Sequence, residues 1–185
     1  MEYKLPEGFD SRGEAIESIM KKEIDSGESE LVLIKQGVEK FLLDKKGYSK
    51  DEIETDKEFD VVIGNEICKS KADIIISIDG GRLILIKCSA GALVSRERQA
   101  LACARVLDSY QIPFAVVTDG KDVTMLNTVT GEVISEGLEK IPSKDGLKKI
   151  MGQIEFKELP ANRVEKEKRI LLAFDAIKCS INYGE

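Results

Sequence analysis

The residues with the most evident chemical potential are an acid and a lysine on two neighbouring strand candidates. The chain contains no histidine, so any catalysis must use carboxylates, lysines or hydroxyls. Asp73 opens an apolar, β-branched segment, and Lys87 ends the apolar segment after the next turn. Carboxylates can hold Mg²⁺ through hard oxygen ligands, and a lysine can stabilise the charge that develops on a phosphate. The pattern is therefore typical of phosphodiester hydrolysis.

Several segments surround this pair in a fixed order: Lys71-Ala72-Asp73, Leu83 to Ser89, Gln99, Ala115 to Gly120, and the helix around Lys35-Gln36 that leads to Lys46-Gly47-Tyr48. Over about residues 30 to 130, this order resembles the N-terminal nuclease domain of type I restriction-enzyme R subunits. It implies the PD-(D/E)xK fold, an α/β restriction endonuclease-like mixed β-sheet flanked by helices. It also implies a Mg²⁺ site at the hairpin.

The resemblance assigns roles to four residues, and two of them have the wrong chemistry. Asp73 takes the place of the first metal-binding acid. Lys87 stands where the family has the metal-binding glutamate, and Ser89 stands where it has the catalytic lysine. Reading Leu85-Ile86-Lys87 instead recovers the lysine but puts an apolar side chain at the metal. Gln99 fits the family's glutamine, although Cys103 replaces the tyrosine expected four residues later.

These substitutions predict a catalytically degenerate domain, with Lys87 paired to Asp73 and no cofactor. In the alternative, a divergent Mg²⁺-dependent endonuclease, a relocated acid would complete the site. Glu39 is the relocated metal ligand that we name, and Glu66 and Glu97 are further candidates. Asp73 is equally well explained as an ordinary strand-opening residue, and Lys87 as a strand-end charge.

Composition limits the other function classes. The net charge of −6 gives no general attraction to nucleic acid, so DNA binding would need a local basic patch. Four scattered cysteines, without histidine, form no recognisable zinc pattern and are expected to be buried thiols. No apolar run approaches the roughly 18 residues of a membrane span, and Met1 to Leu5 opens no signal peptide. We therefore expect a cytoplasmic protein that does not enter a membrane.

The elements that must position the site follow from periodicity and turn signals. A capping box at Ser11 to Glu14 predicts a first helix over about 12–25, and a second amphipathic helix follows from Leu31 to a C-cap at Gly47. Strands are predicted at 59–63 and 73–78, both central, and at 83–87 after a tight hairpin at Asp79 to Arg82.

The second half of the chain predicts a helix from Ser95 to near Tyr110 that covers the sheet, and strands at 114–118, 123–126 and 131–134. Helices are predicted at 143–154 and 160–181. We divide the chain into a restriction endonuclease-like domain, 1–155, and a C-terminal helical extension, 156–185, that packs on the same domain or reaches a partner. Candidate partners are DNA, another protein, or a second copy in a homodimer, which includes use of the nuclease fold as an interaction module.

Overall fold

The computed structural model describes residues 12–181, apart from the side chains of 12–16, 19, 20, 23, 24 and 176–181. The predicted capping box includes Ser11, which lies outside the described residues, as does the signal-peptide prediction for residues 1–5. The side chain of Cys179 is also outside the described part. No helix within residues 12–181 combines the length and the apolar character needed to cross a membrane.

Six strands form one mixed sheet in the sequential order β1-β2-β3-β4-β5-β6. The strands are β1 (Ile53–Ile63), β2 (Glu66–Ile78), β3 (Gly81–Cys88), β4 (Phe114–Thr118), β5 (Val123–Asn127) and β6 (Val133–Glu136). Only β3 and β4 pair in parallel. The helix α2 (Val94–Val106) connects them, because two parallel neighbours need a crossover connection. This is the mixed α/β architecture that the sequence predicts.

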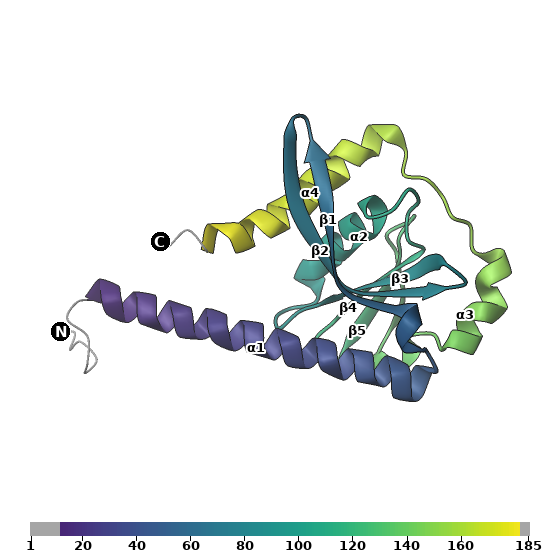
Figure 1. Ribbon diagram of the computed structural model, residues 1–185, viewed down its shortest axis with the longest axis horizontal. Coiled ribbons are helices and arrows are strands. Elements are labelled where there is room, and N and C mark those ends of the chain that lie inside the picture. Colours follow the sequence, from purple (N-terminus) through teal and green to yellow (C-terminus); the bar gives the residue numbers. More distant parts are fainter. Residues whose placement is uncertain (1–11, 182–185) are drawn as a thin grey trace.

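Helices cover both faces of the sheet (Figure 1). The C-terminal half of α1 (Arg12–Lys46) buries Val38 and Leu42 against one face, where Ile74, Ile76, Ile84 and Ile86 lie. On the other face, α2 and α4 (Ala161–Ile181) pack with Ile75, Leu85, Ala115 and Val117. Successive strand residues point to opposite faces, so one apolar run on β2 and one on β3 supply both cores.

The tight hairpin predicted between β2 and β3 is confirmed. Asp79 and Gly80 have positive φ values of 51° and 83°, and Ile78 pairs with Gly81. Two central residues with positive φ give a turn whose twist matches that of the flanking strands. The predicted C-cap is also confirmed, because Gly47 has a φ of 76° and the Tyr48 amide donates to the carbonyl of Leu42.

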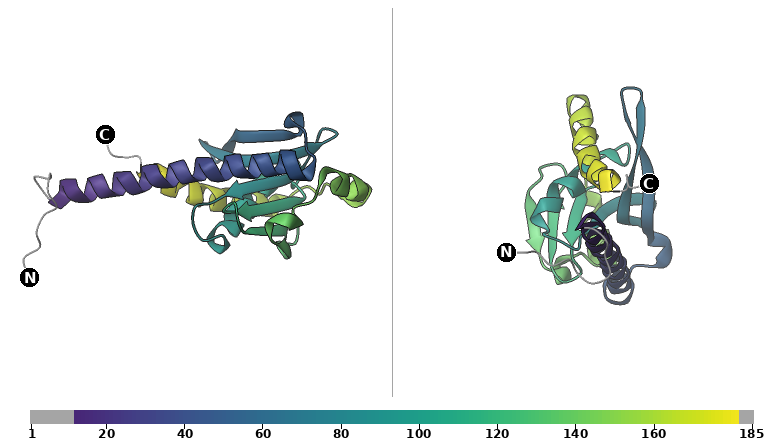
Figure 2. Two further views of the ribbon diagram at one scale, coloured as in Figure 1. Left: turned by 90° about the horizontal axis from the view of Figure 1, so that it is seen from below. Right: turned by 90° about the vertical axis from the view of Figure 1, so that its left-hand side faces the viewer.

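Two predicted helices are in fact one. The prediction broke the N-terminal segment at Ser26-Gly27, whereas α1 continues through it. A single glycine costs a helix only about 1 kcal/mol relative to alanine, and the flanking segments are rich in glutamate, lysine and leucine. As a result α1 is a long rod whose N-terminal half extends beyond the sheet (Figure 2).

The first two strands are much longer than predicted, and β1 is not central. Strand β1 starts at Ile53 rather than Phe59, and β2 starts at Glu66 rather than Asp73. They form a hairpin that projects from the sheet (Figure 1), with β1 as an edge strand. Its charged residues hid it from the sequence reading, because a solvent-exposed ribbon lacks the apolar run of a buried strand.

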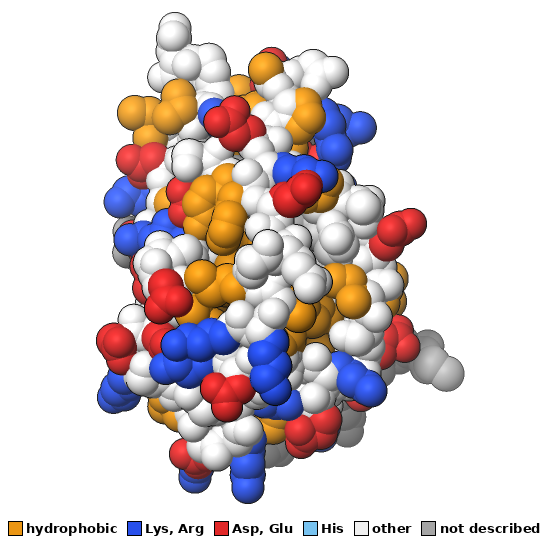
Figure 3. Space-filling view, turned by 90° about the vertical axis from the view of Figure 1, so that its right-hand side faces the viewer, with side chains coloured by type: hydrophobic (Ala, Val, Ile, Leu, Met, Phe, Trp, Pro, Cys, Tyr) orange, Lys and Arg blue, Asp and Glu red, His pale blue; other side chains and the backbone are white. Residues whose placement is uncertain are grey.

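The remaining boundaries differ by a few residues. Helix α2 ends at Val106, short of Tyr110, and β6 starts at Val133 because Gly131, with a φ of 79°, belongs to the preceding turn. Helix α3 (Lys144–Ile150) ends in the 3-10 turn Met151–Gln153, which together match the predicted helix over 143–154. Further 3-10 turns lie at Lys50–Glu52 and Leu138–Lys140. The face around α3 mixes apolar, basic and acidic side chains (Figure 3).

The attachment of α1 to the sheet gives a testable prediction. Leu42→Ala removes a fully buried side chain, and we expect it to lower the free energy of unfolding by about 3 kcal/mol. Leu33→Ala on the same helix is the matched control, since Leu33 is 68% exposed and its loss should cost under about 0.5 kcal/mol. Urea denaturation measures both. Equal losses would contradict the placement of α1.

Candidate site at the β2–β3 hairpin

Asp73 and Lys87 form a buried ion pair across two neighbouring strands. Lys87 follows Ile86, whose register partner on β2 is Ile74, so the antiparallel register brings Asp73 beside it. The ammonium Nζ of Lys87 lies 3.1 Å from Oδ2 of Asp73, and the two side chains are 5% and 2% exposed. The pairing of these two residues, which the sequence suggested, is therefore present in the fold.

Both charged groups are also held by the backbone. The amide of Cys88 donates to Oδ2 of Asp73 at 2.8 Å, and Lys87 donates to the carbonyl oxygen of Lys71 at 2.9 Å. Burial disfavours the ammonium form, but the negative charge of Asp73, aided by its hydrogen bond and by the charge of Asp175, outweighs it and raises the pKa of Lys87. Lys87 therefore stays protonated at neutral pH.

A second acid, Asp56, lies at the same level of the sheet. Asp56 and Asp73 both fall between the register pairs Thr55–Ile74 and Lys57–Ala72. Asp56 has a φ of 53°, and its Oδ1 accepts contacts from Lys35 at 2.6 Å and Lys71 at 2.9 Å. Burial opposes ionisation of Asp56, yet the hydrogen bonds from these two lysines lower its pKa. Both acids at this level are thus occupied by lysines.

The other predicted site residues do not join the pair. Ser89 is buried, but its hydroxyl contacts Gly91 in a local turn, and its amide donates to Thr118. Gln99 is buried on α2, where it donates to Oδ1 of Asp175 at 3.4 Å and accepts from Arg96. Gln99 therefore contacts the C-terminal helix instead of Asp73.

Among the described residues, none of the relocated acids belongs to a group of three side chains that could hold a metal. Glu66 starts the same strand seven residues earlier, about 23 Å away along an extended backbone. Glu39 on α1 and Glu97 on α2 are half-buried, and no hydrogen bond or ion pair involves either of them among the described residues. Their proposed role in metal binding gains no support from these positions.

Asp175 is the site residue that sequence reasoning missed. It lies on α4, its Oδ2 is buried without a hydrogen-bond partner, and its charge contributes to the raised pKa values of Lys87 and Cys103. The signal was present in the sequence: Asp175 is the only charged residue in the apolar run from Ile170 to Ile177. A charge inside such a stripe usually has a buried partner. Asp56 had no comparable signal.

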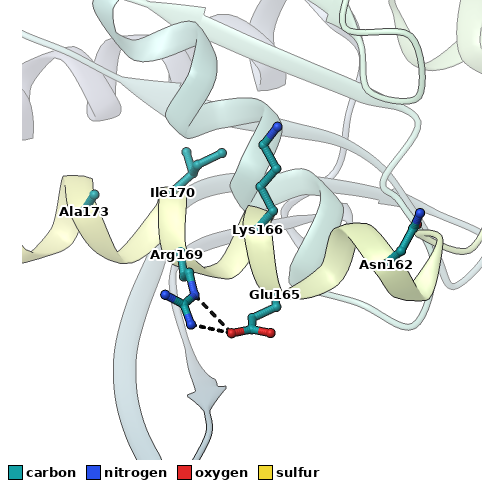
Figure 4. A pocket seen from close by; sticks show the side chains of 6 residues that line it. All are labelled: Asn162, Glu165, Lys166, Arg169, Ile170 and Ala173. Atoms are coloured by element: carbon teal, nitrogen blue, oxygen red, sulfur yellow. Dashed lines mark hydrogen bonds and ion pairs between the residues drawn. The ribbon is translucent and has the colours of Figure 1, made fainter.

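The donor set does not fit Mg²⁺. The ion prefers several oxygen ligands in near-octahedral geometry, whereas Asp73 faces an ammonium and a backbone amide. Across the described residues, no three side chains of Asp, Glu, His or Cys are grouped so that they could hold a metal. The recess on the surface of α4 is a separate feature, about 530 Å³ in volume and lined by that helix alone (Figure 4).

A mixed sheet with helices on both faces, and with the β2–β3 hairpin presenting Asp73 to Lys87, is consistent with a nuclease-like fold. A family model described as type I restriction enzyme R protein N terminus (HSDR_N) matches residues 32–142, more than half of the chain. The chain belongs to this family. No curated protein and no solved structure matches it.

The buried pair predicts a large and non-additive effect on stability. Lys87→Met leaves Asp73 as an uncompensated buried charge, so we expect a loss of about 3–5 kcal/mol in the free energy of unfolding. Adding Asp73→Asn, which keeps an oxygen for the Cys88 amide, should restore part of this loss. Lys69→Met, at an exposed pair with Glu58, is the control and should cost under about 1 kcal/mol. Additive losses in denaturant titrations would contradict a coupled pair.

The thiols give a second prediction. Burial raises the pKa values of Cys88 and Cys103 to about 12, whereas Cys68 is half-buried. Because the thiolate is the reactive form, iodoacetamide at pH 8 should label Cys68 at least about 10-fold faster than Cys88 or Cys103. Peptide mass spectrometry of the native protein resolves each site. Comparable labelling of Cys103 would show that the interior beside Lys87 is open.

Proposed function

We propose that this chain is a nuclease-fold domain that binds DNA or a partner protein and does not hydrolyse phosphodiester bonds efficiently. The observation that carries the proposal is the Lys87 ammonium, 3.1 Å from the Asp73 carboxylate in a buried environment. The ammonium supplies the positive charge that a metal ion would otherwise supply to this acid. Unlike a metal, it cannot lower the pKa of a bound water to generate a nucleophile.

Electrostatics support the loss of metal binding. A divalent cation would approach Lys87 at close range, where like charges repel strongly in a low-dielectric interior. The acid at the same level, Asp56, is already held by Lys35 and Lys71. Because both carboxylates are already paired with ammonium groups, Mg²⁺ would have to displace a lysine to bind either one.

A protein-interaction module on a nuclease scaffold is the second candidate function. It is favoured by the N-terminal half of α1, which extends past the sheet (Figure 2), and by exposed apolar residues near the middle of this helix. Val32 and Leu33 are 46% and 68% exposed there. Such a module would bind a protein or a second copy of the chain, and it would not need DNA.

A nicking assay combined with metal titration tests the proposal. We expect wild-type protein to leave supercoiled plasmid intact with Mg²⁺ or Mn²⁺ and to show no calorimetric metal binding. Lys87→Glu with Ser89→Lys would restore the acid and the lysine at the positions that the family motif assigns to them. We expect this double variant to be less stable without metal and to be stabilised by Mn²⁺ in thermal denaturation.

The control is Ser89→Lys alone, which keeps Lys87 and should gain no metal response. Wild-type nicking that requires metal and disappears in Asp73→Asn would overturn the proposal in favour of a divergent endonuclease. An electrophoretic shift of DNA without cleavage would support the DNA-binding form of the proposal. Neither a shift nor cleavage would favour the interaction module.

A further inference from the structure

Three arginines converge on one buried glutamate where α2 packs against α4. Glu167 of α4 is 1% exposed, and its carboxylate lies 2.6 Å from Arg98, 3.1 Å from Arg105 and 3.2 Å from Arg163. Burial opposes ionisation, but the hydrogen bond and charge of Arg98 together with the charge of Arg105 lower the pKa of Glu167. The glutamate is therefore ionised at neutral pH.

One arginine would suffice to neutralise this glutamate. Arg105 is itself buried, and it also donates to the backbone carbonyl of Thr128 at 2.9 Å, so it forms a complete structural pair. Arg98 and Arg163 add two further positive charges. Among the side chains that the structure describes, Glu167 is the only carboxylate within ion-pair distance of any of the three, which leaves the cluster with a net charge of about +2.

Burial lowers the pKa of Arg105, and the repulsion of Arg163 and Arg98 adds to this effect, although the charge of Glu167 opposes it. The side chains of Arg98 and Arg163 are 37% and 41% exposed, so both lie at the surface edge of the cluster, unlike the buried Arg105. An anion bound between Arg98 and Arg163 would relieve the repulsion among the guanidinium groups. A purely structural ion pair would need only one arginine.

An unused hydrogen-bond donor lies in the same cluster. Nη1 of Arg98 is buried without an acceptor. Buried polar atoms normally have partners. Arg163 lies in the first turn of the 21-residue helix α4, where the helix dipole also favours negative charge.

We propose that Arg98 and Arg163 form a binding site for a phosphate group, with Arg105 and Glu167 fixing its floor. The planar guanidinium offers paired N–H donors that match phosphate oxygens. The phosphate belongs either to a polynucleotide backbone or to a free nucleotide, and the experiment separates these sources. In its polynucleotide form the inference rests on the proposed function and gives the non-cleaving domain its DNA contact.

Binding is measured by fluorescence anisotropy with a labelled 20-base-pair duplex in EDTA, over a range of salt concentrations. We expect Arg98→Gln and Arg163→Gln each to weaken binding at least about 5-fold and to reduce the slope of log K against log salt by about one. Arg163→Lys keeps the charge, so it should retain the slope while losing affinity.

Arg169→Gln is the matched control. It removes the same charge from the same helix, but Arg169 pairs with exposed Glu165 and lies two residues beyond Glu167, about 200° around the helix. Figure 4 shows this pair on the side of α4 opposite to Lys166. We expect a change of less than about 2-fold in Kd, within the usual effect of a surface charge. Thermal denaturation of each variant confirms that it is folded.

Competition with adenosine monophosphate and inorganic phosphate identifies the source. If neither compound competes with the duplex at millimolar concentration, the site binds a polynucleotide. If competition occurs and depends on Arg98 and Arg163, the site binds a free phosphate compound. Absence of binding to any of these probes, or an equal loss in Arg169→Gln, would overturn the inference. The binding experiment contains EDTA, so it tests the phosphate site without any metal-dependent cleavage. The proposal that the domain does not hydrolyse DNA is tested separately, and only metal-dependent nicking would contradict it.

Discussion

The buried pair of Asp73 and Lys87 is the constraint on which the centre of this structure depends. Removing each ion from water costs several kcal/mol, and only close pairing with further hydrogen bonds offsets that cost. Here the Cys88 amide and the Lys71 carbonyl supply those bonds. Both come from β2 and β3 themselves, so the charges are satisfied only in this register of the hairpin. A one-residue slip of either strand would turn its charge into the apolar core on the other face and separate the pair.

The same pair supplies the positive charge that a buried acid requires. A carboxylate taken out of water is costly unless a cation and hydrogen bonds compensate it. Lys87 compensates the buried Asp73, whereas Lys35 and Lys71 pair with Asp56, which is about half exposed. Each of these acids therefore has an ammonium partner within the chain itself.

Sequence reasoning predicted well what depends on local pattern. The β2–β3 hairpin, the glycine cap of α1 and the family all followed from turn chemistry and segment order. It failed where tertiary context decides. Helix α1 runs through Gly27 because its neighbours propagate the helix, and the ends of β1 and β2 carry no apolar run because the hairpin projects into solvent. Gln99 was placed at the site by the family pattern, but its partner proved to be Asp175, which only the packing of α4 could reveal.

Helix α4 lies beyond the residues that the family model matches, yet it decides access to the centre. Glu167, Leu171 and Asp175 are spaced four apart, so they share the face that packs on α2. Glu167 binds Arg98 and Arg105. Leu171 fills the apolar interface, and Asp175 binds Gln99. Asp73 and Lys87 lie beside this interface and are almost completely buried. A polynucleotide cannot reach these two buried side chains. Any phosphate that the domain binds must therefore be held at the surface. There, α2 and α4 already gather more positive charge than Glu167 requires.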